Sequence, residues 1–171
     1  MYATMQRLII LRGAPGSGKS TIAKSYRNLE KKIAWLKVDN FKDFFAEDAS
    51  TALEFVNGTA IASLKYLLEQ GFSVVMEGIF QTITAIDEAS EISKKLDIPS
   101  KVFELETPLE ILLKRDIKRE GVPEGLRRPL GEELIARLYN LLKENPYPSA
   151  IKLNTEELSL EKCKKLIDES F

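Results

Sequence analysis

The stretch LRGAPGSGKST, residues 11–21, contains three glycines and one proline and follows directly on the apolar run RLIIL at residues 7–11. From Gly13 to Ser20 it matches the pattern G-x-x-x-x-G-K-[ST], and the helical stretch STIAKSYRNLEKK comes next. This order of strand, loop and helix is the context that a phosphate-binding loop requires. We therefore expect the loop to bind the phosphates of a nucleoside triphosphate.

The residue types of this loop suit phosphate chemistry. Glycines let the backbone bend and approach phosphate oxygens, while N–H groups and the dipole of the following helix attract negative charge. Lys19 is expected to bridge the β- and γ-phosphates, and Ser20 to bind Mg²⁺. The predicted nucleotide-binding residues are Gly13, Ala14, Pro15, Gly16, Ser17, Gly18, Lys19, Ser20 and Thr21. The alternative is a flexible turn with a solvated lysine; a chance match to the pattern is on the order of one in a hundred.

Composition limits the remaining chemistry. The chain has 171 residues, 44% of them hydrophobic and 30% charged, which suits one domain, residues 1–171. It has no histidine, which excludes imidazole catalysis and histidine-based zinc sites. A net charge of −1 gives no overall attraction to nucleic acid. Apolar runs are too short to cross a bilayer, and the first residues lack a signal peptide's features, so we expect a cytoplasmic protein.

Apolar runs typical of strands recur along the chain, and each is followed by a helical pattern. They occupy residues 7–11, 33–38, 72–77, 101–106 and 150–154. The alternation predicts an α/β fold with a mainly parallel, doubly wound sheet and helices on both faces. Ligands bind beyond the carboxyl ends of the strands in such a sheet, so functional residues are expected directly after these runs. One helix is predicted to begin with a capping box of Thr107 as N-cap and Glu110 at N3.

Two carboxylates stand at the ends of predicted strands. Asp39, in WLKVD, is interpreted as the base that accepts the proton of an attacking hydroxyl, with a helix N-cap or a solvated charge pair as the alternatives. Lys42, within a helical turn of it, is a second candidate for binding the substrate. Glu77, in VVME, has several open roles: to hold a metal-bound water, to orient a cation, to bind the acceptor, or simply to stand in a turn.

Two arginines follow on one predicted helix. Arg115 and Arg119 are spaced i, i+4 and are expected to face away from the side that carries Leu113 and Ile117. Such a pair suits the γ-phosphate, where kinases bring arginines on a lid to neutralise transition-state charge. The glycine- and proline-rich stretch at about residues 119–131 is the predicted lid. A solvated basic face paired with neighbouring carboxylates is the alternative.

Several other nucleotide-binding classes lack their signatures here. The chain has no D-x-x-G and no N-K-x-D, the elements that a switch-type GTPase needs. It also has no L-S-G-G-Q, the signature of a transporter ATPase. The small P-loop kinases remain, because they carry the acceptor-binding groups in the same domain.

With these residues the chain resembles the small P-loop kinases that include polynucleotide 5′-hydroxyl kinases, zeta toxins and chloramphenicol phosphotransferase. The likeness spans nearly the whole chain as an ordered set of GAPGSGKS, DNFKD, VVMEG and RDIKRE, of which only the first is highly specific. It implies a three-layer P-loop NTPase fold with a five-stranded sheet of order 2-3-1-4-5 and a short lid.

The resemblance also implies roles for single residues. Asp39 matches the general base of polynucleotide kinases, whereas Lys42 stands where those enzymes usually have arginine and so lacks the bidentate fork. Arg115 and Arg119 look like the lid arginines. Glu77 is similar to the strand-end glutamate of zeta toxins, which implies contact with the acceptor.

The sequence thus predicts a Mg²⁺-dependent kinase that moves the γ-phosphoryl group of ATP, or alternatively GTP, to an acceptor hydroxyl. The acceptor is a small molecule or a polynucleotide 5′-hydroxyl, nucleic acid enters only as substrate, and no membrane is involved. The expected catalytic residues are Lys19, Asp39, Arg115 and Arg119. A nucleoside monophosphate kinase and an ATP-binding regulatory module without an acceptor are the alternatives.

Overall fold

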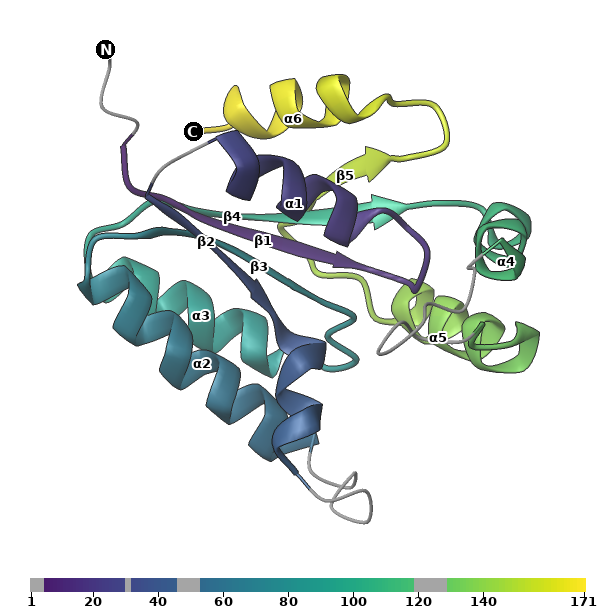
Figure 1. Cartoon of the computed structure of the whole chain (residues 1–171), viewed down its shortest axis with the longest axis horizontal. Coiled ribbons are helices and arrows are strands. Elements are labelled where there is room, and N and C mark those ends of the chain that lie inside the picture. Colours follow the sequence, from purple (N-terminus) through teal and green to yellow (C-terminus); the bar gives the residue numbers. More distant parts are fainter. Residues whose placement is uncertain (1–4, 30–31, 46–52, 119–128) are drawn as a thin grey trace.

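The computed structural model describes residues 5–29, 32–45, 53–118 and 129–171. Its centre is a five-stranded sheet in the order β2-β3-β1-β4-β5, and all neighbouring strands pair in parallel (Figure 1). The strands are β1 (Leu8–Gly13), β2 (Ile33–Lys37), β3 (Ser73–Gly78), β4 (Ser100–Glu106) and β5 (Ile151–Asn154). The predicted α/β fold and the strand order implied by the resemblance are both confirmed.

Helices lie on both faces of the sheet. One face is covered by α1 (Lys19–Leu29) and α6 (Leu160–Asp168), the other by α2 (Leu53–Glu69) and α3 (Thr84–Lys95) (Figure 1). The short 3₁₀ helix η1 (Val38–Phe44) follows β2 directly, while α4 (Leu109–Ile117) and α5 (Glu132–Glu144) lie past the carboxyl ends of the strands. The carboxyl edge is therefore surrounded by η1, α4 and α5.

The central strand shows why the sequence folds into layers. Successive side chains of β1 point to opposite faces, so Leu8 and Ile10 pack in the core under α2 and α3, whereas Ile9 and Leu11 pack under α1 and α6. Every residue of β1 is buried, as expected for a parallel strand covered on both faces. The phosphate loop therefore extends from a strand that is buried along its whole length.

The predicted start of α4 is wrong by one residue. Pro108 is the N-cap and its side chain has no atom that could accept a capping bond. The hydroxyl of Thr107, the predicted N-cap, pairs instead with the Thr155 hydroxyl at 2.6 Å. The buried face of α4 is also displaced from the predicted one. Leu112 and Asp116 are buried, whereas Ile117 is 79% exposed. Leu112 packs with α5 and Ala14, which brings α4 against the phosphate loop.

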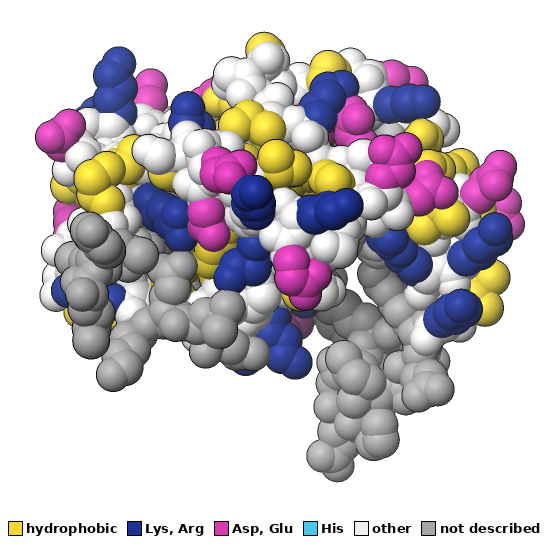
Figure 2. Space-filling model, turned by 90° about the horizontal axis from the view of Figure 1, so that it is seen from above, with side chains coloured by type: hydrophobic (Ala, Val, Ile, Leu, Met, Phe, Trp, Pro, Cys, Tyr) yellow, Lys and Arg dark blue, Asp and Glu magenta, His cyan; other side chains and the backbone are white. Residues whose placement is uncertain are grey.

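Arg119 and residues 119–128 of the predicted lid lie outside the described residues. In the part of the chain that is described, no helix is long and apolar enough to span a membrane. Cys163 is buried in the core between α1 and α6, and burial raises the pKa of its thiol. On the face that carries α6 and α1, basic and acidic side chains alternate without a large patch of one sign (Figure 2).

Candidate functional site

The phosphate loop between β1 and α1 has the backbone that its glycines permit. Gly16 and Gly18 have φ of 86° and 100°, in the left-handed region that favours glycine. A Cβ on Gly13 would stand 2.6 Å from Ser17 Oγ, so this position needs glycine for space. The backbone angles at Gly16 and Gly18 and the lack of space at Gly13 thus explain why glycines stand at these three positions of the motif.

Lys19, the first residue of α1, folds back over this loop. Its Nζ donates hydrogen bonds to the carbonyl oxygens of Gly13 at 2.8 Å and Ala14 at 2.9 Å, and the residue is only 8% exposed. The ammonium therefore lies against the loop that is expected to enclose the phosphates. Phosphate oxygens are stronger acceptors than carbonyls for a cation, so they can replace these two partners.

Ser20 and Glu77 meet at the base of the loop. Ser20 Oγ donates to Glu77 Oε1 at 2.7 Å, and Glu77 is 2% exposed at the end of β3. The same oxygen accepts from Trp35 Nε1 at 3.0 Å, and the indole ring lies 5.1 Å from the Arg27 guanidinium carbon. A carboxylate with two donors on one oxygen has a fixed direction. The sequence predicted Ser20 and Glu77 separately, but gave no signal for Trp35.

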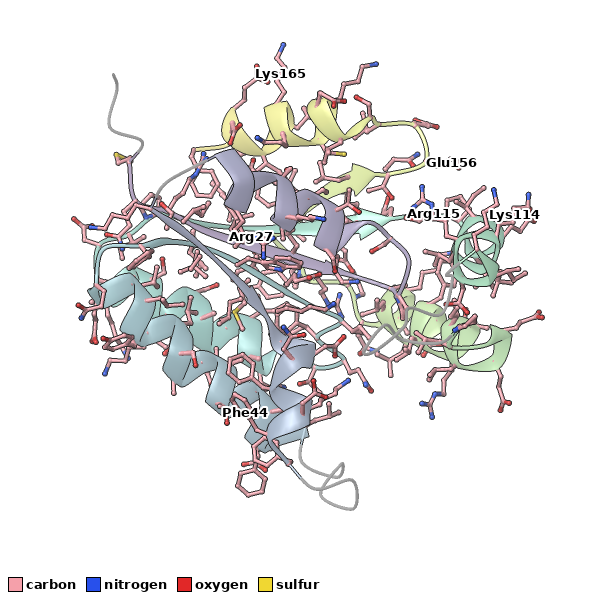
Figure 3. The ribbon with its side chains drawn as sticks, viewed as in Figure 1. Arg27, Phe44, Lys114, Arg115, Glu156 and Lys165 are labelled. Atoms are coloured by element: carbon pink, nitrogen blue, oxygen red, sulfur yellow. The ribbon has the colours of Figure 1, made fainter. Side chains whose placement is uncertain are left out.

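Arg115 holds the outer side of the loop. One guanidinium nitrogen donates to the Gly16 carbonyl and another to the Thr155 carbonyl, each at 3.0 Å. Thr155 in turn donates from its hydroxyl to the Ser17 carbonyl at 2.9 Å. Figure 3 shows Arg115 between α4 and the turn after β5. In this structure Arg115 therefore braces two backbone segments. Its expected role at the γ-phosphate stays a prediction.

Beneath the loop lies a buried ion pair that sequence reasoning missed. The Arg12 guanidinium is completely buried and contacts Glu104 Oε1 at 2.6 Å. Its Nε donates to the Phe80 carbonyl at 3.2 Å, and Glu104 Oε2 accepts from the Tyr147 amide. Burial lowers the pKa of Arg12, and the carboxylate of Glu104 opposes that shift. The pair joins β1 and β4 to the turn after β3.

Asp39 and Lys42 lie on the other side of the carboxyl edge. Asp39 stands in the first turn of η1, and its Oδ1 is 2.8 Å from Lys42 Nζ. The N-cap of η1 is Lys37, which makes no side-chain capping bond, so the alternative N-cap role for Asp39 is not observed. Asp39 is 22% exposed at its side chain. It is accessible to a ligand while it holds the neighbouring ammonium.

A cavity of about 900 Å³ adjoins Asp39. It is bounded by η1, by the first half of α2, and by the turn after β3 with the first turn of α3. Phe80, whose carbonyl accepts from Arg12, is one of its lining residues. The candidate site thus has two parts, a phosphate loop with Ser20 and Glu77 and a separate cavity with Asp39 and Lys42.

Comparison with known proteins adds the family. Residues 8–140 match the AAA_33 family, described as an AAA domain. The chain belongs to this family. It is a family of small P-loop kinases, so the comparison confirms the kinase group, the enzyme class and the nucleotide-binding domain that the sequence predicts.

Three of the known proteins that are similar to the chain illustrate its relationships. The L-seryl-tRNA(Sec) kinase of Methanococcus maripaludis is 31% identical over 134 residues, which is 74% of this chain and 51% of that protein. The tunicamycin resistance protein of Deinococcus radiodurans has a TM-score of 0.67 and 14% identity, over 96% of this chain and 95% of the other. A sugar kinase from Janibacter sp. HTCC2649 has a TM-score of 0.64 and 23% identity, over 96% and 92%. The two solved structures support the fold alone, and the chain spans about half the length of the seryl-tRNA kinase.

Proposed function

We propose that the protein is an ATP- and Mg²⁺-dependent kinase that transfers the γ-phosphoryl group to an acceptor hydroxyl. The observation that carries this proposal is the Asp39 carboxylate in the wall of the 900 Å³ cavity at the carboxyl edge of the sheet. A module that only binds a nucleotide needs no second cavity, and still less one with a carboxylate that can accept a proton.

The nucleotide side supplies charge stabilisation. Backbone N–H groups of the loop and the amino end of α1 favour the phosphates, and Lys19 exchanges the Gly13 and Ala14 carbonyls for phosphate oxygens. Arg115 fixes the loop through the Gly16 carbonyl, and in this proposal its positive charge assists from the same side. Arg119, which is outside the described residues, keeps its predicted place as the second arginine of a lid.

The donor set at the base of the loop fits magnesium. The Ser20 hydroxyl and Glu77 carboxylate are oxygen ligands, and Mg²⁺ typically uses one or two protein oxygens together with waters and substrate phosphates. The described residues contain no group of three or more carboxylate or cysteine ligands, which a closed metal site would need. When bound, the cation neutralises charge that develops between the β- and γ-phosphates.

This assignment places Glu77 on the metal side and is open to a direct test. In Glu77→Gln the amide keeps the shape but loses the charge, so we expect the Mg²⁺ concentration for half-maximal ATP binding to rise about tenfold. Glu106→Gln, a half-exposed carboxylate at the end of β4, is the matched control. Binding of ATP in EDTA should be unchanged in both variants, and an unchanged Mg²⁺ requirement in Glu77→Gln would contradict the assignment.

Asp39 activates the acceptor in this proposal. Its carboxylate accepts the proton of the hydroxyl as oxygen attacks phosphorus, and Lys42, 2.8 Å away, stabilises the ionised carboxylate beforehand. The decisive experiment supplies ATP labelled at the γ-phosphate together with hydroxyl acceptors, and compares the wild type with Asp39→Asn and with Asp43→Asn. Asp43 is an exposed carboxylate on the same short helix.

We expect transfer to be lost in Asp39→Asn and retained in Asp43→Asn, with ATP affinity equal in all three proteins. Nucleotide binding without transfer in the wild type would favour the regulatory module. Transfer to nucleoside monophosphates alone would favour the monophosphate kinase. Loss of ATP binding in Asp39→Asn would make that residue structural.

A second candidate acceptor is the seryl hydroxyl of an aminoacylated tRNA. It is favoured by the 31% identity to the seryl-tRNA(Sec) kinase. Because the chain spans 51% of that protein, binding of a tRNA body has to be tested on this chain itself. Seryl-tRNA and free serine, offered side by side with labelled ATP, distinguish recognition of the tRNA from recognition of the amino acid.

A further inference from the structure

The chemistry of the cavity beside Asp39 narrows the kind of acceptor that it can hold. Its walls come from three separate segments, η1, the first half of α2, and residues 79–88. Its volume of about 900 Å³ is within the range of ligand cavities in proteins. The cavity is therefore large enough for a whole small molecule, beyond the single hydroxyl that reacts.

The charge of the lining is mainly negative. Among the described residues that line the cavity, the carboxylates are Asp39, Glu54 and Glu88, and the one ammonium is that of Lys42. Lys42 already pairs with Asp39 at 2.8 Å. An acceptor that carries phosphate or carboxylate would meet two further like charges and, among the described lining residues, no second cation, which is unfavourable in a partly enclosed space.

Apolar side chains form much of the remaining wall. Leu53 and Phe55, on the first turn of α2, are 40% and 65% exposed although they are large hydrophobic residues. Val38, Val56 and Phe80 are buried and line the same cavity. When a ligand covers exposed apolar groups at the rim of a cavity, the removal of apolar surface from water makes binding more favourable. The lining thus favours a ligand with an apolar part.

We propose that the acceptor is a small hydroxyl compound with an apolar part and no anionic group, either uncharged or cationic, and that it binds in this cavity. This inference rests on the proposed kinase activity. The acceptor oxygen forms a bond to the γ-phosphorus, the bond between that phosphorus and the oxygen of ADP breaks, and the hydroxyl proton passes to Asp39. The products are a phosphate monoester and ADP.

The experiment offers acceptors sorted by charge. A metabolite extract separated by ion exchange gives uncharged, cationic and anionic pools, and a 5′-hydroxyl oligonucleotide and seryl-tRNA extend the anionic arm. Each is incubated with Mg²⁺ and γ-labelled ATP, and with wild type or Asp39→Asn. We expect label that depends on Asp39 in the uncharged or the cationic pool only.

Matched variants then locate the bound acceptor. Phe55 and Tyr66 are both aromatic residues of α2, 65% and 63% exposed, but only Phe55 lines the cavity. For the labelled acceptor, Phe55→Ala should raise KM about fivefold, as loss of part of one apolar contact implies, while Tyr66→Ala leaves it unchanged. The KM for ATP should be the same in both variants, since neither residue lies at the phosphate loop.

Charge reversal gives a second matched pair. The test variant combines Glu54→Lys with Glu88→Lys and so reverses the charge of both cavity carboxylates that are not paired with Lys42. The control variant combines Glu69→Lys with Glu91→Lys, which makes the same change on α2 and α3 outside the cavity. For a cationic acceptor we expect a KM about tenfold higher in the first double variant only. For an uncharged acceptor both should leave KM unchanged.

The outcomes separate the two proposals. Label in the anionic pool, the oligonucleotide or the seryl-tRNA that depends on Asp39 would keep the kinase and overturn this acceptor class. If Phe55→Ala raises the acceptor KM no more than Tyr66→Ala does, binding of the acceptor in the cavity is contradicted. The same conclusion follows if the KM for a cationic acceptor is unchanged in Glu54→Lys with Glu88→Lys. If no pool is labelled in an Asp39-dependent way, the kinase proposal fails, and the acceptor class with it.

Discussion

The nucleotide side and the acceptor side of the carboxyl edge are built in different ways. On the nucleotide side Lys19 and Glu77 are 8% and 2% exposed, and their polar atoms contact defined partners in the loop. On the acceptor side Phe44 and Phe55 are 72% and 65% exposed on η1 and α2. Backbone geometry and buried hydrogen bonds fix the first region, whereas exposed side chains define the second. The fold of the first region is therefore expected to be sensitive to single changes, whereas the second should tolerate most of them, with Asp39 as the exception.

On the nucleotide side the largest effect is expected at Lys19. In Lys19→Met the ammonium that is expected to reach the phosphates is lost, so kcat/KM for phosphoryl transfer should fall about 10³-fold. Lys24→Met, which removes an exposed lysine one turn later on α1, should change it less than twofold. A fall of less than tenfold in Lys19→Met would mean that the nucleotide side does not depend on this residue.

The next effect concerns the buried ion pair of Arg12 and Glu104. Arg12 directly precedes the phosphate loop and contacts Phe80 in the wall of the acceptor cavity. Glu104→Leu leaves the Arg12 guanidinium buried without its carboxylate, so the free energy of unfolding should fall by about 3 kcal/mol. Urea unfolding measures this change. Adding Arg12→Met to Glu104→Leu removes the stranded charge and should restore most of the loss. A double variant as unstable as the single one would show that the charge is not the cause.

A smaller effect tests the hydrogen bond that orients Glu77 on the nucleotide side. Trp35→Phe keeps an aromatic ring but removes the N–H that directs Glu77 Oε1. We expect the Mg²⁺ concentration for half-maximal ATP binding to rise about threefold, because Trp35 acts on the cation only through Glu77 and a fraction of this hydrogen bond's contribution reaches the metal. ATP affinity in EDTA should not change. A purely structural role would lower stability without any shift in the Mg²⁺ requirement.

The smallest effect is expected on the acceptor side. Phe44 makes one edge-to-face contact with Phe41 at 5.4 Å between ring centroids and is otherwise exposed. Phe44→Ala should lower the free energy of unfolding by about 0.5 kcal/mol and leave ATP affinity unchanged. If the free energy of unfolding fell by more than about 2 kcal/mol, this region would be packed as firmly as the phosphate loop. The difference between the nucleotide side and the acceptor side would then not hold.

The sequence was most informative where local backbone chemistry decides the structure. Gly13, Gly16 and Gly18 identified the loop because their spacing reflects steric needs that any sequence with this loop must meet. Alternating strand and helix patterns were enough for the sheet, because each strand has to be covered on both faces. Ser20 and Glu77 were proposed as site residues from the same local patterns, Ser20 as the last residue of the loop motif and Glu77 at the end of a predicted strand, and the structure brings their side chains together.

Contacts between distant segments were not predictable from the sequence. The partners Arg12 and Glu104 are 92 positions apart, and nothing in either local pattern indicates the other. The predicted capping box failed because the Thr107 hydroxyl finds a partner in Thr155, which only the folded sheet brings near. Arg115 was predicted from its spacing to Arg119 as an arginine for the γ-phosphate, and its bond to the Gly16 carbonyl was not predicted because that bond depends on how α4 packs.

The single tryptophan of the chain gives the protein an optical signal of its own. The indole of Trp35 donates to the same carboxylate oxygen that holds the Ser20 hydroxyl, and a guanidinium lies 5.1 Å from its ring. Indole emission responds to the charge and hydrogen bonding around the ring. A cation that draws Glu77 toward it changes both, so the intrinsic fluorescence of the unlabelled protein should report the arrival of metal and nucleotide in real time.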